Sequence, residues 1–205
     1  LIATGGYPRV PAIAGAEHGI TSDGFFELDR LPERPLVVGG GYSAVELAGI
    51  FQALGSRVTL ALRGAELLRH FDPMLGSGLA EEMKRAGVEL VTHFESARLE
   101  RDAAGLELLG QDGRKLGADV VLFAVGRSPA TGRLGLENAG VELDSERLVA
   151  VDAFQNTSAS GIYAVGDVTN LGPHLTPVAI AAGRKLADRL FGGEPEARLD
   201  YADTP

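Results

Sequence analysis

The stretch Pro35–Ala48, PLVVGGGYSAVELA, decides the fold that we expect of this chain. A run of apolar, largely β-branched residues leads into three glycines, and a pattern typical of a helix follows them. Read as G-x-G-x-x-A, with Gly39, Gly41 and Ala44 at the defining positions, the motif predicts a dinucleotide-binding turn between a strand and a helix.

Each of these small residues has a separate task in such a turn. Gly39 permits the tight turn, Gly41 lets the backbone approach a pyrophosphate, and Ala44 lets the helix pack closely on the strand. The amide groups at the helix start then attract the phosphate charge. A glycine-rich turn alone is a weak signal, but a second strand pattern, at 57–62, follows at the spacing of a βαβ unit. We therefore expect a cofactor site rather than a merely structural turn.

Composition limits the classes of protein to which the chain can belong. Its 205 residues, 45% of them hydrophobic, predict one or two α/β domains. The net charge of -9 argues against nucleic acid and anionic membranes as partners, and no apolar run reaches the ~18 residues of a membrane span. Without cysteine the chain can form no disulfide, thiolate metal site or thiol catalyst. The four histidines lack metal-ligand spacing, so we expect no metal site.

Hydrophobic periodicity and turn residues predict the other elements. We expect helices at 42–54 and 76–86, and a third that runs to about residue 190 with Thr176 as its N-cap. A buried strand at 119–126 returns to the parallel sheet, and Asp112-Gly113 marks the turn of an antiparallel β-meander. The predicted class is α/β, a Rossmann-like domain with a parallel sheet and this meander. Further strands are expected at 57–62, 88–92, 148–151 and 161–165, with a loop at 127–147.

Two arginines follow the second strand of the βαβ unit, where NAD-binding units usually carry an acidic residue. Here that position holds Leu62, and Arg63 and Arg69 come next. An acid would repel a 2′-phosphate, whereas guanidinium groups bind phosphate oxygens in pairs of hydrogen bonds. The pattern favours NADPH over NADH. The alternative is that both arginines are solvated surface residues.

Tyr42 and Glu46 lie four residues apart and so share one face of the first helix, just past the glycine turn. One interpretation places them beside a bound nicotinamide. The other makes Tyr42 a packed aromatic and Glu46 a solvated acid, and spacing alone does not separate the two.

A second cofactor signal lies in the later part of the chain. The strand pattern that ends in Gly166-Asp167 puts a carboxylate at a strand's carboxyl end, where α/β proteins bind ligands. Thr176, followed by Pro177, predicts a helix start whose amides favour an anion. Two such starts in one chain suggest two cofactors. An ordinary turn and a well-capped surface helix are the alternative.

Together these segments resemble the glutathione reductase branch of the flavin-dependent pyridine nucleotide–disulfide oxidoreductases. The resemblance runs over essentially the whole chain, with many motifs in the same order. Its residues are 2–6, 22–26, 41–49, 68–72, 124–127, 154–157, 161–167 and 175–179.

The resemblance implies roles for individual residues. Arg63 and Arg69 would hold the NADPH 2′-phosphate, Tyr42 would cover the flavin until NADPH displaces it, and Gly126 would lie near the nicotinamide. Thr4, Asp167 and Thr176 would contact FAD. The remaining residues implied to line the NADPH site are Gly39, Gly40, Gly41, Ser43, Ala44 and Glu46.

The resemblance also implies that the chain is part of a longer protein. That protein would be a cytoplasmic homodimer that passes hydride from NADPH to FAD, and electrons on to a cysteine pair and glutathione disulfide. Because the cysteine pair lies upstream in the family, the isolated chain should be inactive. Alternatives are another disulfide reductase, such as trypanothione reductase, or a non-catalytic nucleotide-binding fragment. The implied segments are 1–6, the end of an FAD domain; 7–128, NADPH-binding; 129–195, central; and 196–205, the start of an interface domain.

Overall fold

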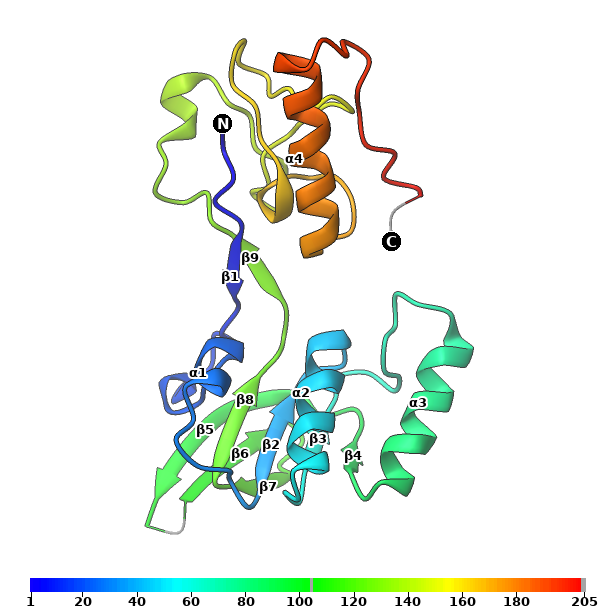
Figure 1. The fold of residues 1–205 in the computed structure, drawn as a ribbon. Coiled ribbons are helices and arrows are strands. Elements are labelled where there is room, and N and C mark those ends of the chain that lie inside the picture. The colour runs from blue at the N-terminus through cyan, green and yellow to red at the C-terminus, as the bar shows by residue number, and fades with distance from the viewer. Residues whose placement is uncertain (104, 204–205) are drawn as a thin grey trace. The chain divides into compact units, whose positions relative to one another are not determined.

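The computed structural model describes residues 1–103 and 105–203, and its elements are labelled in Figure 1. The chain divides into two compact units. We call residues 8–126 the sheet unit, and residues 1–7 together with the chain from Arg127 onward the α4 unit. Each unit is described by itself.

A four-stranded parallel sheet forms the centre of the sheet unit, in the order β4-β3-β2-β8. Strand β2 lies between two parallel neighbours, so that Val37 pairs with Leu60 on one side and with Leu122 on the other. All four residues of β2 are buried, as the apolar run predicted. The strands span Pro35–Val38 (β2), Thr59–Ala61 (β3), Glu89–Val91 (β4) and Val120–Phe123 (β8).

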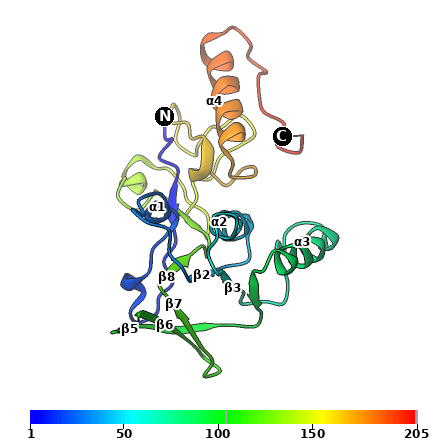
Figure 2. The same cartoon turned by 60° about the horizontal axis from the view of Figure 1, so that its bottom comes forward.

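Different layers cover the two faces of this sheet, because successive strand side chains point to opposite sides. Val37 packs with residues of the helices, whereas Leu36 and Val38 pack with the meander. Figure 2 shows the helices above the sheet and the meander below it. The helices are α1 (Ser22–Phe26), α2 (Tyr42–Ala53) and α3 (Pro73–Arg85). A 3₁₀ turn, η1 (Ala16–His18), packs on the meander side instead, where Ala16 is buried. The meander is β5 (Ser96–Asp102), β6 (Gly105–Gly110) and β7 (Lys115–Ala118).

The predicted α/β class is confirmed, and so is the βαβ unit. Helix α2 ends before Gly55, whose φ of 104° only glycine adopts readily. The meander turn is also as predicted, because the Gly113 amide donates to the Gly110 carbonyl at 3.1 Å. Helix α3 begins three residues before the predicted Gly76, since the Asp72 carboxylate accepts from the Met74 amide and caps a helix with proline at its start.

The α4 unit contains little regular structure apart from one long helix. Its elements are β1 (Gly6–Pro8), which pairs with β9 (Arg127–Pro129), the 3₁₀ helices η2 (Leu136–Ala139) and η3 (Gly166–Val168), and α4 (Thr176–Phe191). The helix packs through Val178, Ala182 and Leu186.

The range 127–147, predicted as a loop, is largely irregular but also holds the two short elements β9 and η2, which the sequence did not predict. Strands predicted at 148–151 and 161–165 were wrong, since both ranges form only isolated bridges such as Ile2–Ala164. Left-handed residues lie next to or between these ranges, among them Arg147 at φ 66° and Gln155 at φ 61°. Within the described residues, no helix has the length and apolar character that a membrane span requires.

Candidate functional site

The glycine turn after β2 packs so closely against its neighbours in the sheet unit that Gly39 has no space for a side chain. This residue has a φ of 145°, and its amide donates to the Ala61 carbonyl at 2.9 Å. A Cβ added to Gly39 would lie 2.3 Å from the Ala124 carbonyl oxygen and 3.2 Å from the Ala44 Cβ. Glycine at 39 and a small residue at 44 are therefore what allow α2 to start directly against the sheet.

Gly41 has the opposite surroundings. It is the N-cap of α2, with extended backbone, and no side chain caps the helix. A Cβ added to Gly41 would meet no neighbouring atom within 4 Å. Space therefore remains beside the uncapped amides of a twelve-residue helix, which is the arrangement that binds phosphate.

The loop after β3 folds back onto the glycine turn. The Leu68 amide donates to the Gly40 carbonyl at 2.7 Å, a contact that the sequence did not predict. Arg63 and Arg69 lie in this loop and are both exposed, while Leu62 before them is buried. The Arg69 Nε donates to His70 Nε2 at 3.0 Å. The structure thus places two cationic side chains on the loop that borders the turn.

The sheet order puts the carboxyl ends of β3, β2 and β8 side by side, with β2 in the middle. The chain leaves β2 toward β3 on one side, whereas β8 lies on the other side. Ligands of open α/β sheets bind at such a switch point. Gly126, just after β8, has a φ of 115°, and an added Cβ would meet nothing within 4 Å. Both Gly41 and Gly126 therefore leave open space at this edge of the sheet.

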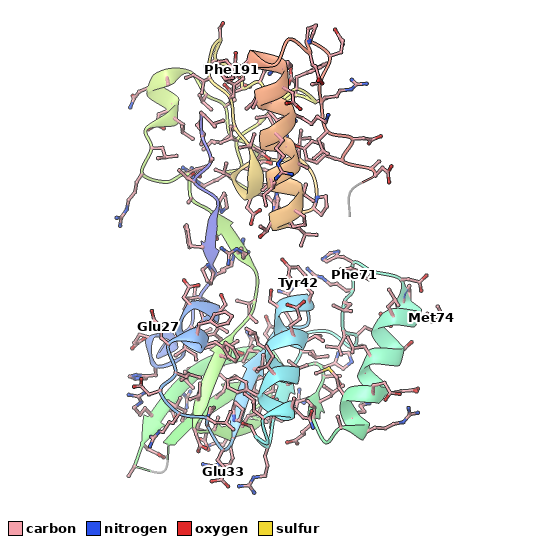
Figure 3. The ribbon with its side chains drawn as sticks, in the orientation of Figure 1. Glu27, Glu33, Tyr42, Phe71, Met74 and Phe191 are labelled. Carbon is pink, nitrogen blue, oxygen red and sulfur yellow. The ribbon has the colours of Figure 1, made fainter. Side chains whose placement is uncertain are left out.

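Tyr42 and Glu46 are exposed on α2, and Figure 3 labels Tyr42 at the start of this helix. The Tyr42 side chain is 42% exposed, so it is not a packed core aromatic. Ser43 beside it is half-buried. These exposures leave the helix start accessible, and the nicotinamide role of Tyr42 and Glu46 stays a prediction.

A groove of about 330 Å³ in the α4 unit brings together two of the three residues predicted to contact FAD. Asp167 and Thr176 both line it. Thr4 does not: its hydroxyl donates to the Ala130 carbonyl at 3.0 Å. The sequence analysis assigned no contact with FAD to the other residues of the groove, although all but Ile180 lie in segments that carry the family resemblance. These other residues are Ala3, Gly5, Val165, Gly166, Ala179 and Ile180.

The prediction that Thr176 is the N-cap of the last helix was wrong. Leu175 is the N-cap, because its backbone is extended and its carbonyl accepts the first helical bond, from the Ala179 amide at 3.0 Å. Thr176 is the first helical residue, and no side chain caps the helix. The start of α4 therefore keeps free amides and positive partial charge, although Thr176 does not cap them.

The charged side chains of the described residues form no cluster suited to a metal ion. Both candidate sites instead combine glycine-rich backbone with the start of a helix, and carry few ionisable groups. Such sites suit ligands with phosphate groups or other anionic parts.

Comparison with known proteins gives a family and several relatives. Residues 1–183 match the family model described as pyridine nucleotide-disulphide oxidoreductase. The chain is 44% identical to glutathione reductase from Schizosaccharomyces pombe, covering 100% of this chain and 45% of the relative. It is 45% identical to glutathione reductase from Burkholderia cepacia, covering 95% and 43%. The chain thus spans less than half the length of these relatives.

Solved structures give the same picture of the fold. The Cu(II) complex of HOCl-induced flavoprotein disulfide reductase RclA from Escherichia coli superimposes with a TM-score of 0.89 at 30% identity. This match covers 96% of the present chain and 44% of RclA. LpdA from Mycobacterium tuberculosis gives a TM-score of 0.87 at 33% identity, covering 97% and 43%.

Proposed function

The chain belongs to the pyridine nucleotide-disulphide oxidoreductase family, and on this basis we propose that it is the NADPH-binding and central part of a glutathione-disulfide reductase. The single observation that carries the proposal is the glycine turn at the switch point of the sheet. Gly39 in this turn has no space for a side chain, whereas the space around Gly41 is free. The sheet unit is the proposed NADPH-binding domain, in place of the range 7–128 expected from sequence.

The residues around the turn support NADPH in particular. Uncapped amides of α2 would receive the pyrophosphate. Arg63 and Arg69 are exposed on the adjacent loop and would bind the 2′-phosphate, and Leu62 offers no acid to repel it. Tyr42 and Gly126 would border the nicotinamide. The other residues proposed for this site are Gly39, Gly40, Ser43, Ala44 and Glu46.

The groove of the α4 unit fits part of a flavin site. Asp167 would accept hydrogen bonds from ribityl hydroxyls, and the free amides at the start of α4 would favour negative charge on the reduced ring. Bound FAD would supply the two-electron carrier between NADPH and a disulfide. Because this chain has no cysteine, the thiol step would belong to residues outside it.

Glutathione disulfide is the proposed substrate of the whole protein, because two relatives at 44% and 45% identity are glutathione reductases. Trypanothione disulfide is the alternative within the same family. A homodimer located in the cytoplasm completes the proposal. Turnover of the two disulfides by the whole gene product separates the substrates, and preferred turnover of trypanothione disulfide would refute the first.

NADPH binding by this chain is the direct test. Gly41→Asp adds a capping carboxylate to α2, so it should preserve or raise stability while its charge and volume repel the pyrophosphate. Gly49→Ala is the matched control, since an added Cβ on Gly49 also meets nothing within 4 Å. Calorimetry should show NADPH binding by the unmodified chain and by Gly49→Ala, and none by Gly41→Asp. Undiminished binding by Gly41→Asp would overturn the site.

A further inference from the structure

The segment 169–175 lies between two of the residues that line the groove of the α4 unit, Asp167 and Thr176. Its start is firmly held. Thr169 is buried, its hydroxyl donates to the Gly166 carbonyl at 2.9 Å, and its carbonyl lies 3.0 Å from His174 Nε2. Its middle is exposed around Gly172 and has no regular structure. Some other part of the unit must therefore define the path of this middle part.

The ring of Tyr201 packs directly on Gly172. A Cβ added to Gly172 would lie 2.4 Å from Tyr201 Cδ1, 2.8 Å from Cε1 and 3.4 Å from Val178 Cγ1. Gly172 also has a φ of 79°, which other residues rarely adopt. The contact thus depends on glycine for both its space and its backbone angle. The same ring packs against the apolar cluster of Val165, Ala182 and Leu186.

The hydroxyl end of Tyr201 is fixed as well. Gln155 is fully buried, and its Nε2 donates to the Tyr201 hydroxyl at 3.3 Å. The Gln155 carbonyl accepts from the Ala164 amide at 3.1 Å, which ties this glutamine to the chain just before Val165. Tyr201 is therefore held by an apolar cluster along its ring and by a hydrogen bond at its tip.

This ring lies behind the wall of the groove. Gly166, Asp167 and Ala179 line the groove, and the same three residues line a cavity of about 10 Å³ together with Tyr201. So small a space holds at most about one water molecule. Tyr201 thus shares this cavity with three residues of the groove, and its ring packs on the cluster that contains a fourth, Val165.

We propose that Tyr201 is a positioning residue for the groove. Its ring, seated on Gly172, holds the segment 169–175 and so sets the separation of Asp167 from the start of α4. A role for Tyr201 in flavin binding rests on the proposed function. The contact between Tyr201 and Gly172 lies within the α4 unit and does not depend on that function.

Hydrogen–deuterium exchange on the 205-residue chain, without any cofactor, tests the proposal. Tyr201→Ala should speed amide exchange in peptides spanning 166–180 by about tenfold or more. Tyr201→Phe, which keeps the ring, should stay within about threefold of the unmodified chain. Leu199→Ala is the matched control: Leu199 packs on the same cluster but does not line the small cavity.

Gly172→Ala tests the same contact by changing the glycine instead of the tyrosine. It should raise exchange in the same peptides, and its effect should be smaller in the Tyr201→Ala background, because the clash with the ring is then gone and only the strain at φ 79° remains. If Tyr201→Ala unfolds the unit, exchange in Gly172→Ala that matches the unmodified chain would still overturn the role of Tyr201. Exchange unchanged in both single variants, or raised equally by Leu199→Ala, would overturn the role of Tyr201.

Titration of the same proteins with FAD, monitored by flavin fluorescence, distinguishes the proposed flavin groove from the proposed role of Tyr201. If FAD binds the unmodified chain, Tyr201→Ala should weaken it and Tyr201→Phe should retain it. An unchanged dissociation constant in Tyr201→Ala would contradict a role in positioning. FAD binding by none of the proteins would count against the flavin groove, while the exchange result would still decide whether Tyr201 holds the segment.

Discussion

At the scale of single residues, the glycines of the turn after β2 serve two different needs. Gly39 is required by the protein itself, since both its φ of 145° and the Ala124 carbonyl exclude a side chain. Gly41 has an ordinary φ of -85° and open space around it. The fold does not require glycine at 41, which supports the proposal that a ligand approaches the backbone there.

This difference predicts unequal effects of substitution at 39 and 41 on the free energy of unfolding. Gly39→Ala should lower the free energy of unfolding by about 3 kcal/mol or more, because strain at φ and the backbone clash add together. Gly41→Ser should leave it unchanged or raise it by a few tenths of a kcal/mol, about the gain from a side-chain cap. Urea unfolding measures both. Equal losses of unfolding free energy in Gly39→Ala and Gly41→Ser would contradict the conclusion that the fold requires glycine only at 39.

The proposed preference for NADPH over NADH also depends on single residues. Arg63→Leu with Arg69→Leu should weaken NADPH binding and leave NADH binding unchanged, because only NADPH carries the 2′-phosphate. Each charge-assisted contact contributes roughly 1.5–3 kcal/mol, or about ten- to a hundredfold in affinity. The arginines are exposed, so the lower end applies and salt should reduce the preference. Calorimetry with both nucleotides at low and high salt measures this.

Arg57 provides the control for that experiment. It is an exposed arginine just before β3 that pairs with Glu33, at the opposite end of the strand from Arg63. Arg57→Leu should leave the NADPH preference intact. Equal affinities for NADPH and NADH in the unmodified chain would remove the basis for NADPH specificity.

At the scale of elements, one ion pair joins the starts of β2 and β8. The Asp119 carboxylate accepts from the Arg34 amide at 2.9 Å and from its guanidinium at 2.7 Å. Burial acts to raise the pKa of Asp119, but the hydrogen bonds and charge of Arg34 outweigh it and lower this pKa below its usual value. The pair thus fastens the amino ends of two parallel neighbours.

The lowered pKa predicts how the contribution of this pair depends on pH. A carboxyl group whose pKa is lower in the folded state stabilises the fold above the pKa of the unfolded chain, about 3.9, and this is lost as pH falls through the folded value. Asp119→Asn should therefore cost up to about 1 kcal/mol at pH 7, since both side chains are partly exposed. The cost should shrink below about pH 4. Denaturant unfolding at both pH values checks this, and a pH-independent difference would count against it.

At the scale of the whole molecule, each unit has a core of its own. The sheet unit buries apolar residues on both faces of its sheet, and the α4 unit buries a separate set around Val149 and Leu186. The two proposed cofactors are likewise divided, with NADPH in one unit and part of a flavin site in the other.

The proposed assignment of the thiol step to residues outside this chain predicts the activity of the chain alone. Mixed with NADPH and glutathione disulfide, it should not oxidise NADPH above background, because it has no thiol to pass electrons to the substrate. Absorbance at the NADPH maximum measures this, with a full-length glutathione reductase as positive control. Sustained oxidation by a homogeneous preparation, dependent on glutathione disulfide, would contradict the assignment of the thiol step to other residues.

The sequence by itself determined the features that depend on neighbouring residues. The run from Pro35 to Val38, the glycine turn and the period of α2 all follow from local sterics and from burial on one face, and the structure confirms them. The meander turn at Asp112-Gly113 follows for the same reason.

Only the tertiary structure decided the features that join distant segments. Ile2 lies beside Ala164, Leu68 closes over Gly40, and Tyr201 packs on Gly172. The groove likewise combines the first residues of the chain with η3 and α4. No local pattern encodes such pairs, because each forms only once the intervening chain has folded and both partners have been brought together by packing elsewhere. The strand patterns at 148–151 and 161–165 of the α4 unit form only isolated bridges to other segments.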